Sequence, residues 1–234
     1  MRKILIFVVL TATSLSALSQ AGTTSLKAHY LRIYNQSLTY NDVGTAIGAL
    51  HGYLAEDNSL KYKDTLSMLY FSSKSYVSSL IVAEEVFKAD NGNVIAMARA
   101  AECYDELGDP KTSVLLFEQV TPKTKNPYHY YKLAIGQFQL KRIGECEATA
   151  KIVIADTASK SIGVNFLMED GNQQTVPINA AAVNLLGVIQ MDLKNYAAAK
   201  PYFTQALTLF PAFSGAKQNL AVCDRNLKPV KPKG

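Results

Sequence analysis

The feature that most constrains the fold lies at residues 180–213, where small residues recur at helical spacing within two short amphipathic segments. Only a turn as short as Lys194–Asn195 separates the segments, so the two helices that they form must cross closely. A surface poor in Cβ atoms permits that approach, and Phe203 is expected to fill the space between the helices. The small residues that make the crossing possible are Gly187, Ala199 and Ala206.

This spacing resembles the tetratricopeptide repeat, a 34-residue helix–turn–helix with a Leu-Gly pair, Ala, Phe, Ala and a closing Pro. Gln190 stands where the family usually has an aromatic residue. The resemblance implies an all-α, right-handed α-solenoid whose first helices line a concave face, on which the family binds peptides or extended partner segments. The matching residues are Leu186, Gly187, Ala199, Phe203, Ala206 and Pro211.

Weaker copies of the pattern precede this segment at steps of 33 to 35 residues. The fourth copy aligns Ile135 and Gly136 in its first helix with Ala148, Ile152 and Ala155 in its second. Irregular amphipathic helices carry no fixed spacing, so the near-constant register favours about five stacked helix pairs over an ordinary helical bundle. The expected pairs lie near residues 27–59, 60–93, 94–128, 129–162 and 180–213.

Residues 163–179 interrupt the period, because Ile135 and Leu186 lie 51 residues apart. Strand-favouring residues flank Asp170 and Gly171, which predicts a short β-hairpin insertion. An isolated hairpin is marginal in water, so its apolar side must rest on neighbouring helices or on a partner. The insertion is therefore either part of a binding face or a surface feature without a binding role.

The last part of the chain repeats the Leu-Gly position at Leu220 and Ala221, with no second helix behind it. Residues 214–227 are therefore expected to form a helix that caps the exposed end of the stack. Residues 228–234 alternate Pro and Lys and are expected to be a disordered tail.

Residues 1–19 have the pattern of a cleavable signal peptide, with Arg2 and Lys3 before an apolar run at residues 4–10 and small residues after it. The run is much shorter than the ~20 residues of a membrane span, which argues against stable membrane insertion and against the alternative of an uncleaved anchor. No Cys stands at the cleavage site, so a lipoprotein is not expected. We expect an exported protein, periplasmic or secreted, similar to uncharacterised exported repeat proteins of Bacteroidota-type bacteria.

Charge and cysteine content exclude two further classes of protein. The net charge is +5, falling to +3 once Arg2 and Lys3 are removed, and no basic helix face accompanies it, so nucleic acid is not an expected partner. The three cysteines are odd in number and widely spaced, unlike a disulfide framework. Buried free thiols are the expectation, with one disulfide between two of them as the alternative.

No pattern of catalytic or cofactor-binding residues is present. The three histidines, His29, His51 and His129, have no metal-ligand neighbours at the required spacing. Phosphate-binding glycine loops and the common hydrolase motifs are missing from the sequence. We expect no cofactor, no metal and no enzyme activity; an enzyme with an unrecognised site would instead show a deep pocket with convergent titratable groups.

The expected function is therefore a non-catalytic scaffold that binds a peptide or protein segment on its concave face. The alternative is an accessory protein that binds an envelope polymer or carbohydrate through the tyrosines at residues 128–131 and the hairpin. For Met68, Phe71, Val188 and Met191, packing between repeats is an equal alternative to partner binding. Counting from each Leu-Gly position, the expected partner-binding residues are Asn35, Lys61, Asp64, Met68, Phe71, Arg99, Glu102, Asp105, Tyr130, Gln137, Asn184 and Met191.

Overall fold

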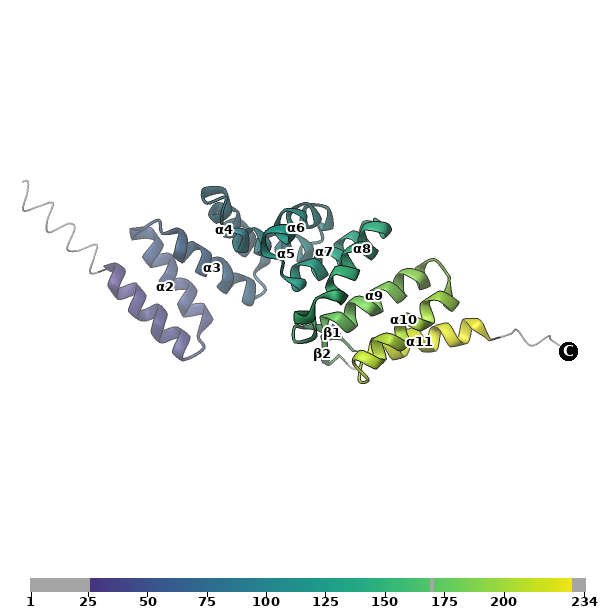
Figure 1. Ribbon diagram of the computed structural model, residues 1–234. Helices are drawn as coiled ribbons and strands as arrows, with labels where there is room; N and C mark the ends of the chain where they lie inside the picture. Colours follow the sequence, from purple (N-terminus) through teal and green to yellow (C-terminus); the bar gives the residue numbers. More distant parts are fainter. Residues whose placement is uncertain (1–25, 169–170, 229–234) are drawn as a thin grey trace, which may run out of the picture. The chain divides into compact units, whose positions relative to one another are not determined.

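The computed structural model describes residues 26–168 and 171–228. The expected signal peptide and the tail from residue 229 onward lie outside the described residues. The described chain is almost wholly helical, and its consecutive helices pack as pairs, which confirms the expected all-α solenoid class (Figure 1). Two compact units make up the chain, one ending at Cys103 and the other beginning at Tyr104.

The N-terminal unit contains two complete helix pairs and most of the first helix of a third. Residues 26–39 are helical and pair with the following helix, α2. The second pair is α3 with α4, and α5 runs from this unit into the next. The bounds are α2 Val43–Glu56, α3 Leu60–Ser72, α4 Tyr76–Ala89 and α5 Val94–Glu106.

The C-terminal unit continues the pairs and contains the insertion. The helix α7 begins at Pro127, and α9 begins at Ile178, directly after the second strand. A short 3-10 helix, η1, precedes the first strand. The bounds are α6 Pro110–Thr124, α7 Pro127–Gln139, α8 Ile143–Ala155, η1 Thr157–Lys160, β1 Gly163–Leu167, β2 Gln173–Pro177, α9 Ile178–Asp192, α10 Tyr196–Leu209 and α11 Ser214–Leu227.

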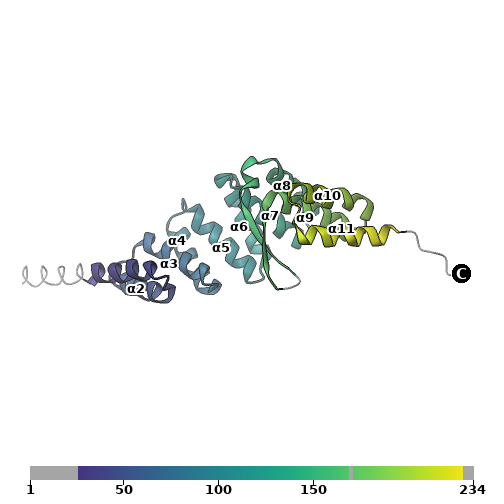
Figure 2. The same cartoon turned by 90° about the horizontal axis from the view of Figure 1, so that it is seen from below.

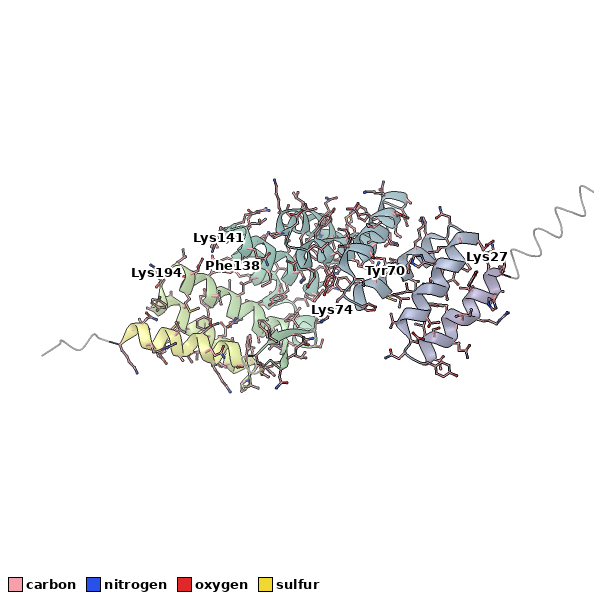
Figure 3. The ribbon with its side chains drawn as sticks, turned by 180° about the vertical axis from the view of Figure 1, so that it is seen from behind. Lys27, Tyr70, Lys74, Phe138, Lys141 and Lys194 are labelled. Carbon is pink, nitrogen blue, oxygen red and sulfur yellow. The ribbon has the colours of Figure 1, made fainter. Side chains whose placement is uncertain are left out.

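Every helix pair contains the same turn between its two helices. One residue of each turn has a positive φ, and the N–H of the next residue donates to the carbonyl five positions earlier at 2.8–2.9 Å. This is the Schellman arrangement, which satisfies the last carbonyls of the first helix. Figure 3 labels three of the turn lysines. The residues with positive φ are Asn41 (55°), Lys74 (59°), Gly108 (84°), Lys141 (60°) and Lys194 (59°).

These turns fix the register of the core. The residues five, nine and twelve positions after each turn residue are all buried, which makes the second helix of every pair contribute the same three positions. The spacing holds through all five pairs despite the change of side chains. The three positions are occupied by Ala46, Leu50 and Tyr53; Ser79, Ala83 and Val86; Ser113, Phe117 and Val120; Cys146, Ala150 and Val153; and Ala199, Phe203 and Ala206.

In the fourth pair, the register expected from the sequence is wrong by two residues. Ile152 was expected in the core but is 49% exposed, whereas Ala150 and Val153 are buried. The residue equivalent to Gly187 is Ala134 rather than Gly136, because the turn lies at Lys141. Gly136 is small for a different reason: a Cβ built there would lie 2.6 Å from Cγ2 of Val114 in α6. Ala148 and Ala155 are likewise exposed, not core residues.

The insertion is an antiparallel hairpin, which Figure 2 shows as two strands. Both strands contact α9 of the same unit. Val176 is fully buried, and the ring of Phe166 packs edge-on against Phe213 with 5.0 Å between centroids. Gln174 spans the α10–α11 turn: its amide donates to the carbonyl of Ala212 at 2.8 Å, and its side-chain oxygen accepts from the N–H of Ser214 at 3.0 Å. The hairpin is thus fastened to the cap.

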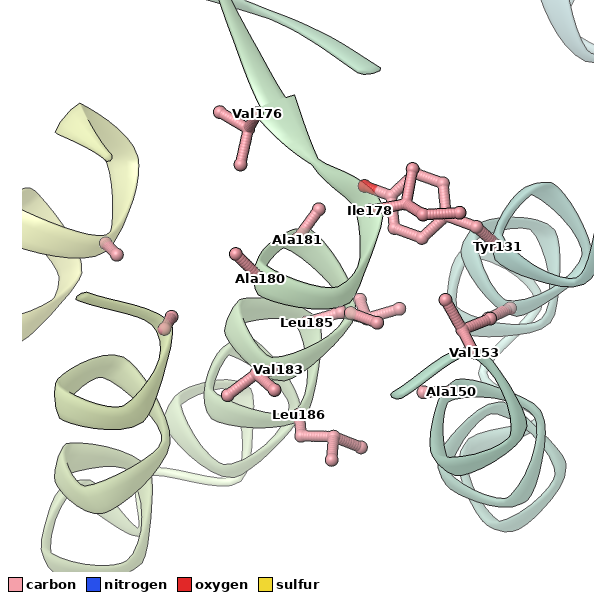
Figure 4. Packing of buried hydrophobic residues seen from close by; sticks show 14 of the residues in the cluster. Tyr131, Ala150, Val153, Val176, Ile178, Ala180, Ala181, Val183, Leu185 and Leu186 are labelled. Carbon is pink, nitrogen blue, oxygen red and sulfur yellow. The ribbon is translucent and has the colours of Figure 1, made fainter. Parts of the chain in front are cut away.

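A large hydrophobic cluster surrounds α9, which lies between α8, α10 and the hairpin (Figure 4). Ten consecutive residues of α9, from Ile178 to Gly187, are buried. A helix that is buried on every side has no polar face, which explains why residues 178–189 carry no charge. The cap α11 contributes Ala216 and Cys223 to the interior.

Candidate interaction face

The first helices of the N-terminal unit carry a row of partly exposed apolar side chains. Residues on one side of a helix recur at steps of three and four, so the positions at Lys61, Asp64, Met68 and Phe71 share one side of α3. Equivalent positions occur on the helix at 26–39 and on α5. We name this surface the first-helix face and define it by Asn35, Leu38, Lys61, Asp64, Met68, Phe71, Ile95, Arg99 and Glu102.

Apolar exposure is the distinguishing property of the first-helix face. Leu38 is 43% exposed, Met68 49% and Ile95 55%. Phe71 is half-buried and packs edge-on against Tyr76 at 5.6 Å between centroids. Lys61 is exposed, with its Nζ 5.6 Å from the centre of the Tyr62 ring. The face therefore offers apolar contact area bordered by polar groups, as peptide-binding surfaces do.

Two charged groups of the first-helix face, Asp64 and Arg99, pair with each other. Nη1 of Arg99 lies 2.5 Å from Oδ1 of Asp64 and 3.4 Å from Oγ of Ser67. The pair joins α3 to α5, and the Arg99 side chain is only 11% exposed. Asp64 therefore has a fixed partner and is poorly placed to hold the charge of a ligand. Asn35 is exposed and Glu102 is half-buried.

In the C-terminal unit several of the expected site residues contact other side chains of the same unit. Asp105 pairs with Lys132 at 2.6 Å, with both side chains about 15% exposed. Asn184 is buried and accepts a hydrogen bond from Asn219 of α11 at 3.2 Å. Val188 and Met191 pack against a cluster that includes Phe203 and Cys223. Both residues are half-buried by these contacts between repeats.

The shift in register also relocates Tyr130 and Gln137. Tyr130 is half-buried against the main core cluster. Gln137 is 4% exposed, so its side chain lies inside the fold and is not available to a partner on a concave surface. Its Oε1 has no hydrogen-bond partner within the described chain. The corrected register assigns the outward positions of α7 to Ile135 and Phe138, and both are half-buried.

The tyrosines at residues 128–131 do not form an exposed stacking surface. Tyr131 is 6% exposed, and burial raises the pKa of its hydroxyl far above the usual value. His129 is also buried, with Nδ1 3.0 Å from Oγ1 of Thr124, and burial lowers the pKa of its imidazole. These two side chains belong to the interior of the C-terminal unit.

The described residues contain no group of three or more His, Cys, Asp or Glu side chains placed to hold a metal ion. Cys103, Cys146 and Cys223 are all buried, as expected from the sequence. Burial raises the pKa of Cys146 to about 11, with a further contribution from Glu147, which keeps this thiol protonated and unreactive. Within the described part of the chain, no helix combines the length and hydropathy that a membrane span requires.

A surface hollow on α10 does not resemble an active site. Its lining comes from this one helix, and its titratable residue Lys200 already pairs with Asp224 at 2.7 Å. An enzyme site requires polar groups that converge from several elements. The lining residues are Ala197, Lys200, Pro201, Thr204, Gln205 and Thr208.

Sequence reasoning missed two residues of the first-helix face, Leu38 and Ile95. Both lie at the ends of the row, and their positions follow from the turn residues Asn41 and Gly108 once the turns are known. The Arg99–Asp64 pair spans 35 residues, and the sequence alone gave no reason to join them.

Comparison with known proteins agrees with this fold. Residues 180–213 match the family model of the tetratricopeptide repeat. These residues are therefore a tetratricopeptide repeat, and the remaining helix pairs share its turn and core positions. Among curated proteins, no sequence matches the chain.

Three solved structures with the same fold are similar to this chain, each at low sequence identity. MamA from Desulfovibrio magneticus RS-1, from residue 41 to its end, has a TM-score of 0.66 at 13% identity, covering 81% of this chain and 97% of that one. YrrB, a tetratricopeptide repeat protein with an unusual peptide-binding site, has a TM-score of 0.65 at 13% identity, with 81% and 89% covered. A tetratricopeptide repeat protein from Parabacteroides merdae ATCC 43184 has a TM-score of 0.68 at 10% identity, with 86% and 73% covered.

Proposed function

We propose that the protein is an exported, non-catalytic interaction scaffold that binds a peptide or extended protein segment on the first-helix face. The observation that carries this proposal is the exposed apolar row formed by Leu38, Met68 and Ile95 on successive first helices. The corresponding positions of the C-terminal unit are less exposed, since Val188 and Met191 are half-buried against the protein's own side chains. YrrB, which has the same fold, provides a precedent for a peptide-binding site in such a protein.

The chemistry of the face indicates the kind of segment that fits. Leu38, Met68 and Ile95 supply apolar contacts, while the paired Asp64 and Arg99 present no free charge. Lys61 is the exposed cation of the row on α3. An extended segment with apolar side chains satisfies these features, because burying an unpaired charge against the apolar row would be costly. The segment should also carry little positive charge, because Lys61 is itself a cation.

The binding proposal is tested by affinity capture from envelope extract with residues 20–234 as bait. Met68→Glu combined with Ile95→Glu places charge in the apolar row. Val77→Glu combined with Ile81→Glu is the matched control, because these residues are 58% and 56% exposed but lie on the second helix α4. A partner held by the wild type and the control but lost by the first variant supports the proposal. Equal retention by all three baits contradicts it.

Export is tested separately, by fractionating cells that express the full chain and sequencing the N-terminus of the recovered protein. We expect a periplasmic or secreted form that begins at Gln20 or Gly22, because the sequence offers cleavage after Ser19 or Ala21. A protein that keeps Met1, or that remains in the cytoplasmic fraction, would show that residues 1–19 are not an export signal.

A further inference from the structure

The two hairpin strands form a ladder with a fixed alternation. The N–H of Met168 donates to the carbonyl of Asn172 at 2.8 Å at one end, and the N–H of Ile178 donates to the carbonyl of Ile162 at 2.9 Å at the other. Opposite residues in an antiparallel ladder alternate between hydrogen-bonded and non-hydrogen-bonded pairs. The two end bonds therefore determine which backbone groups between them point into the ladder and which point outward.

Three residues of β1 direct their N–H and carbonyl groups to the outer edge of the hairpin. None of these groups has another backbone partner within residues 26–168 and 171–228. The opposite edge differs, because proline has no N–H to offer an added strand. The outward residues are Gly163, Asn165 and Leu167 on β1, and Gln173, Thr175 and Pro177 on β2.

The apolar side chains on the inner face of the hairpin are less well covered on β1 than on β2. Val164 and Val176 are directly opposite and chemically identical, yet Val176 is fully buried whereas Val164 is half-buried. Phe166, on the same inner face as Val164, is also half-buried. Leu167 lies on the opposite, outer face of the hairpin and is 77% exposed. The inner face of the hairpin is therefore covered beneath β2 and left partly uncovered beneath β1, where a further strand would lie.

The size of this edge determines what can occupy it. A stable interface between two folded proteins buries about 1,200–2,000 Å². A five-residue strand offers much less, so a second copy of the chain held by this edge alone would not form a stable dimer. An extended segment needs less area, because main-chain hydrogen bonds supply affinity and alternate side chains supply specificity.

We propose that the β1 edge is a second binding site, which takes an extended peptide segment by strand addition. The segment would pair with the outward groups of Gly163, Asn165 and Leu167. An apolar or β-branched side chain at every second position would cover the half-buried Val164 and Phe166. This site is separate from the first-helix face, because it lies in the C-terminal unit.

The probe is a phage-displayed library of random linear peptides, selected on the folded protein from residue 20 onward. Leu167→Pro removes one outward N–H without removing a ladder hydrogen bond or a packed side chain. Gln173→Pro is the matched control, because it makes the same change on the outer edge of β2. Leu167→Ala keeps the N–H and tests whether the side chain alone is responsible. Far-ultraviolet circular dichroism and melting curves establish that each variant folds.

We expect peptides enriched on the wild type to bind Gln173→Pro and Leu167→Ala equally well and to bind Leu167→Pro roughly tenfold or more weakly. Bound peptide should also slow amide hydrogen exchange at Asn165 and Leu167. Met68→Glu combined with Ile95→Glu should leave this binding unchanged, so the two sites can be told apart. Failure to enrich any peptide, or equal binding by Leu167→Pro and the wild type, would overturn the proposal.

Discussion

The helix pairs α3–α4 and α9–α10 have the same turn and the same core positions, but different chemistry where their helices cross. In α9–α10, a Cβ built on Gly187 would lie 2.6 Å from the ring of Phe203, so the ring occupies a notch that only glycine leaves open. In α3–α4, Ser67 takes the position of Gly187 and Ala83 takes the position of Phe203, so this residue supplies no aromatic ring to the crossing. Ser67 Oγ donates to the carbonyl of Ser79 at 3.1 Å, and Ser79 Oγ donates to the carbonyl of Ser67 at 2.9 Å.

The difference shows what the repeat requires at its crossing. Small volume is the shared property, because the backbones must approach in both pairs. The interaction that fills the remaining space can be an aromatic ring in a glycine notch or a reciprocal pair of serine hydrogen bonds. Buried hydroxyls are acceptable only when they are satisfied, and these two are. The predictions below alter one crossing at a time.

Removing the ring from the α9–α10 crossing should have the largest effect. Phe203 is fully buried, so Phe203→Ala leaves a cavity and should lower the free energy of unfolding by about 3–5 kcal/mol. Urea denaturation followed by circular dichroism measures this change. Ile152→Ala is the control, because Ile152 is 49% exposed, and it should change stability by less than about 0.5 kcal/mol. Similar losses for both variants would mean that the ring does not hold the crossing.

Filling the glycine notch should be the next most harmful change. Gly187→Ala introduces a methyl group against a fully buried ring and should cost about 1–3 kcal/mol. Gly144→Ala in α8 provides the matched control, since a Cβ there meets nothing within 4 Å. The control should instead stabilise by about 0.5–1 kcal/mol, because alanine favours helix over glycine. Opposite signs in thermal melts would support the close crossing; equal signs would contradict it.

The serine crossing should respond differently to single and double changes. Ser79→Ala leaves the Ser67 hydroxyl with a poorer set of partners and should cost about 1–2 kcal/mol. The Oγ atoms of the two serines also lie 3.4 Å apart, and either single change already removes this contact, so replacing both serines by alanine should cost less than the sum of the single changes. A double-mutant cycle by urea denaturation measures the coupling. Strict additivity would show that the two hydroxyls act independently.

The turn residue should respond alike in both pairs, because its backbone is the same. Lys74 and Lys194 both have φ of 59°, a conformation that glycine adopts without strain. Lys74→Gly and Lys194→Gly should each stabilise by about 0.5–1 kcal/mol, despite the greater flexibility that glycine gives the unfolded chain. Thermal melts of the two variants test this, and Gly108→Ala should show the opposite sign. Different signs at the two lysines would mean that the turns are not equivalent.

Mild acid should weaken the C-terminal unit with the smallest effect of this series. Burial lowers the pKa of His129 in the folded state, so below the ordinary value of about 6.5 the unfolded chain binds a proton first. Stability contributed by neutral His129 is therefore complete above that pH and falls as the pH decreases through it. Amide hydrogen exchange, measured between pH 7 and about pH 5, tests this. It should become faster at low pH in α7, which contains His129, and change less in α3 of the N-terminal unit. His129→Gln should remove the dependence in α7 if the imidazole causes it.

The sequence was sufficient to predict the α9–α10 crossing and the class of fold, because a glycine opposite a phenylalanine leaves a distinctive pattern. It misplaced the fourth pair, since Ala134 and Gly136 are both small and stand two residues apart. One serves the crossing with α8, and the other makes room for Val114 of α6. The repeat pattern shows that a position holds a small residue, but it does not show which neighbouring helix needs the space. For the same reason, the sequence could not show that Gln137 is buried.

Candidate site residues were harder to predict than the fold. Whether Met68 is exposed or Met191 is packed depends on which later helices cover each position, and the repeat pattern is the same for both. The partner of Asp64 lies in a different helix pair. The exposure of these side chains and the partner of Asp64 depend on how successive helix pairs stack. The spacing of residues within a single repeat does not specify that stacking.

The two hydrogen bonds of Gln174 have a mechanical consequence. A helix that is pulled away from its stack separates when the contacts that hold it to its neighbours break. Here Gln174 holds both sides of the turn before α11, and Phe166 packs against Phe213 in the same turn. Force applied to α11 therefore passes into a strand that lies 40 residues earlier in the chain. The helix α11, the turn before it and the hairpin must therefore separate together, so the insertion resists the removal of α11 from its unit.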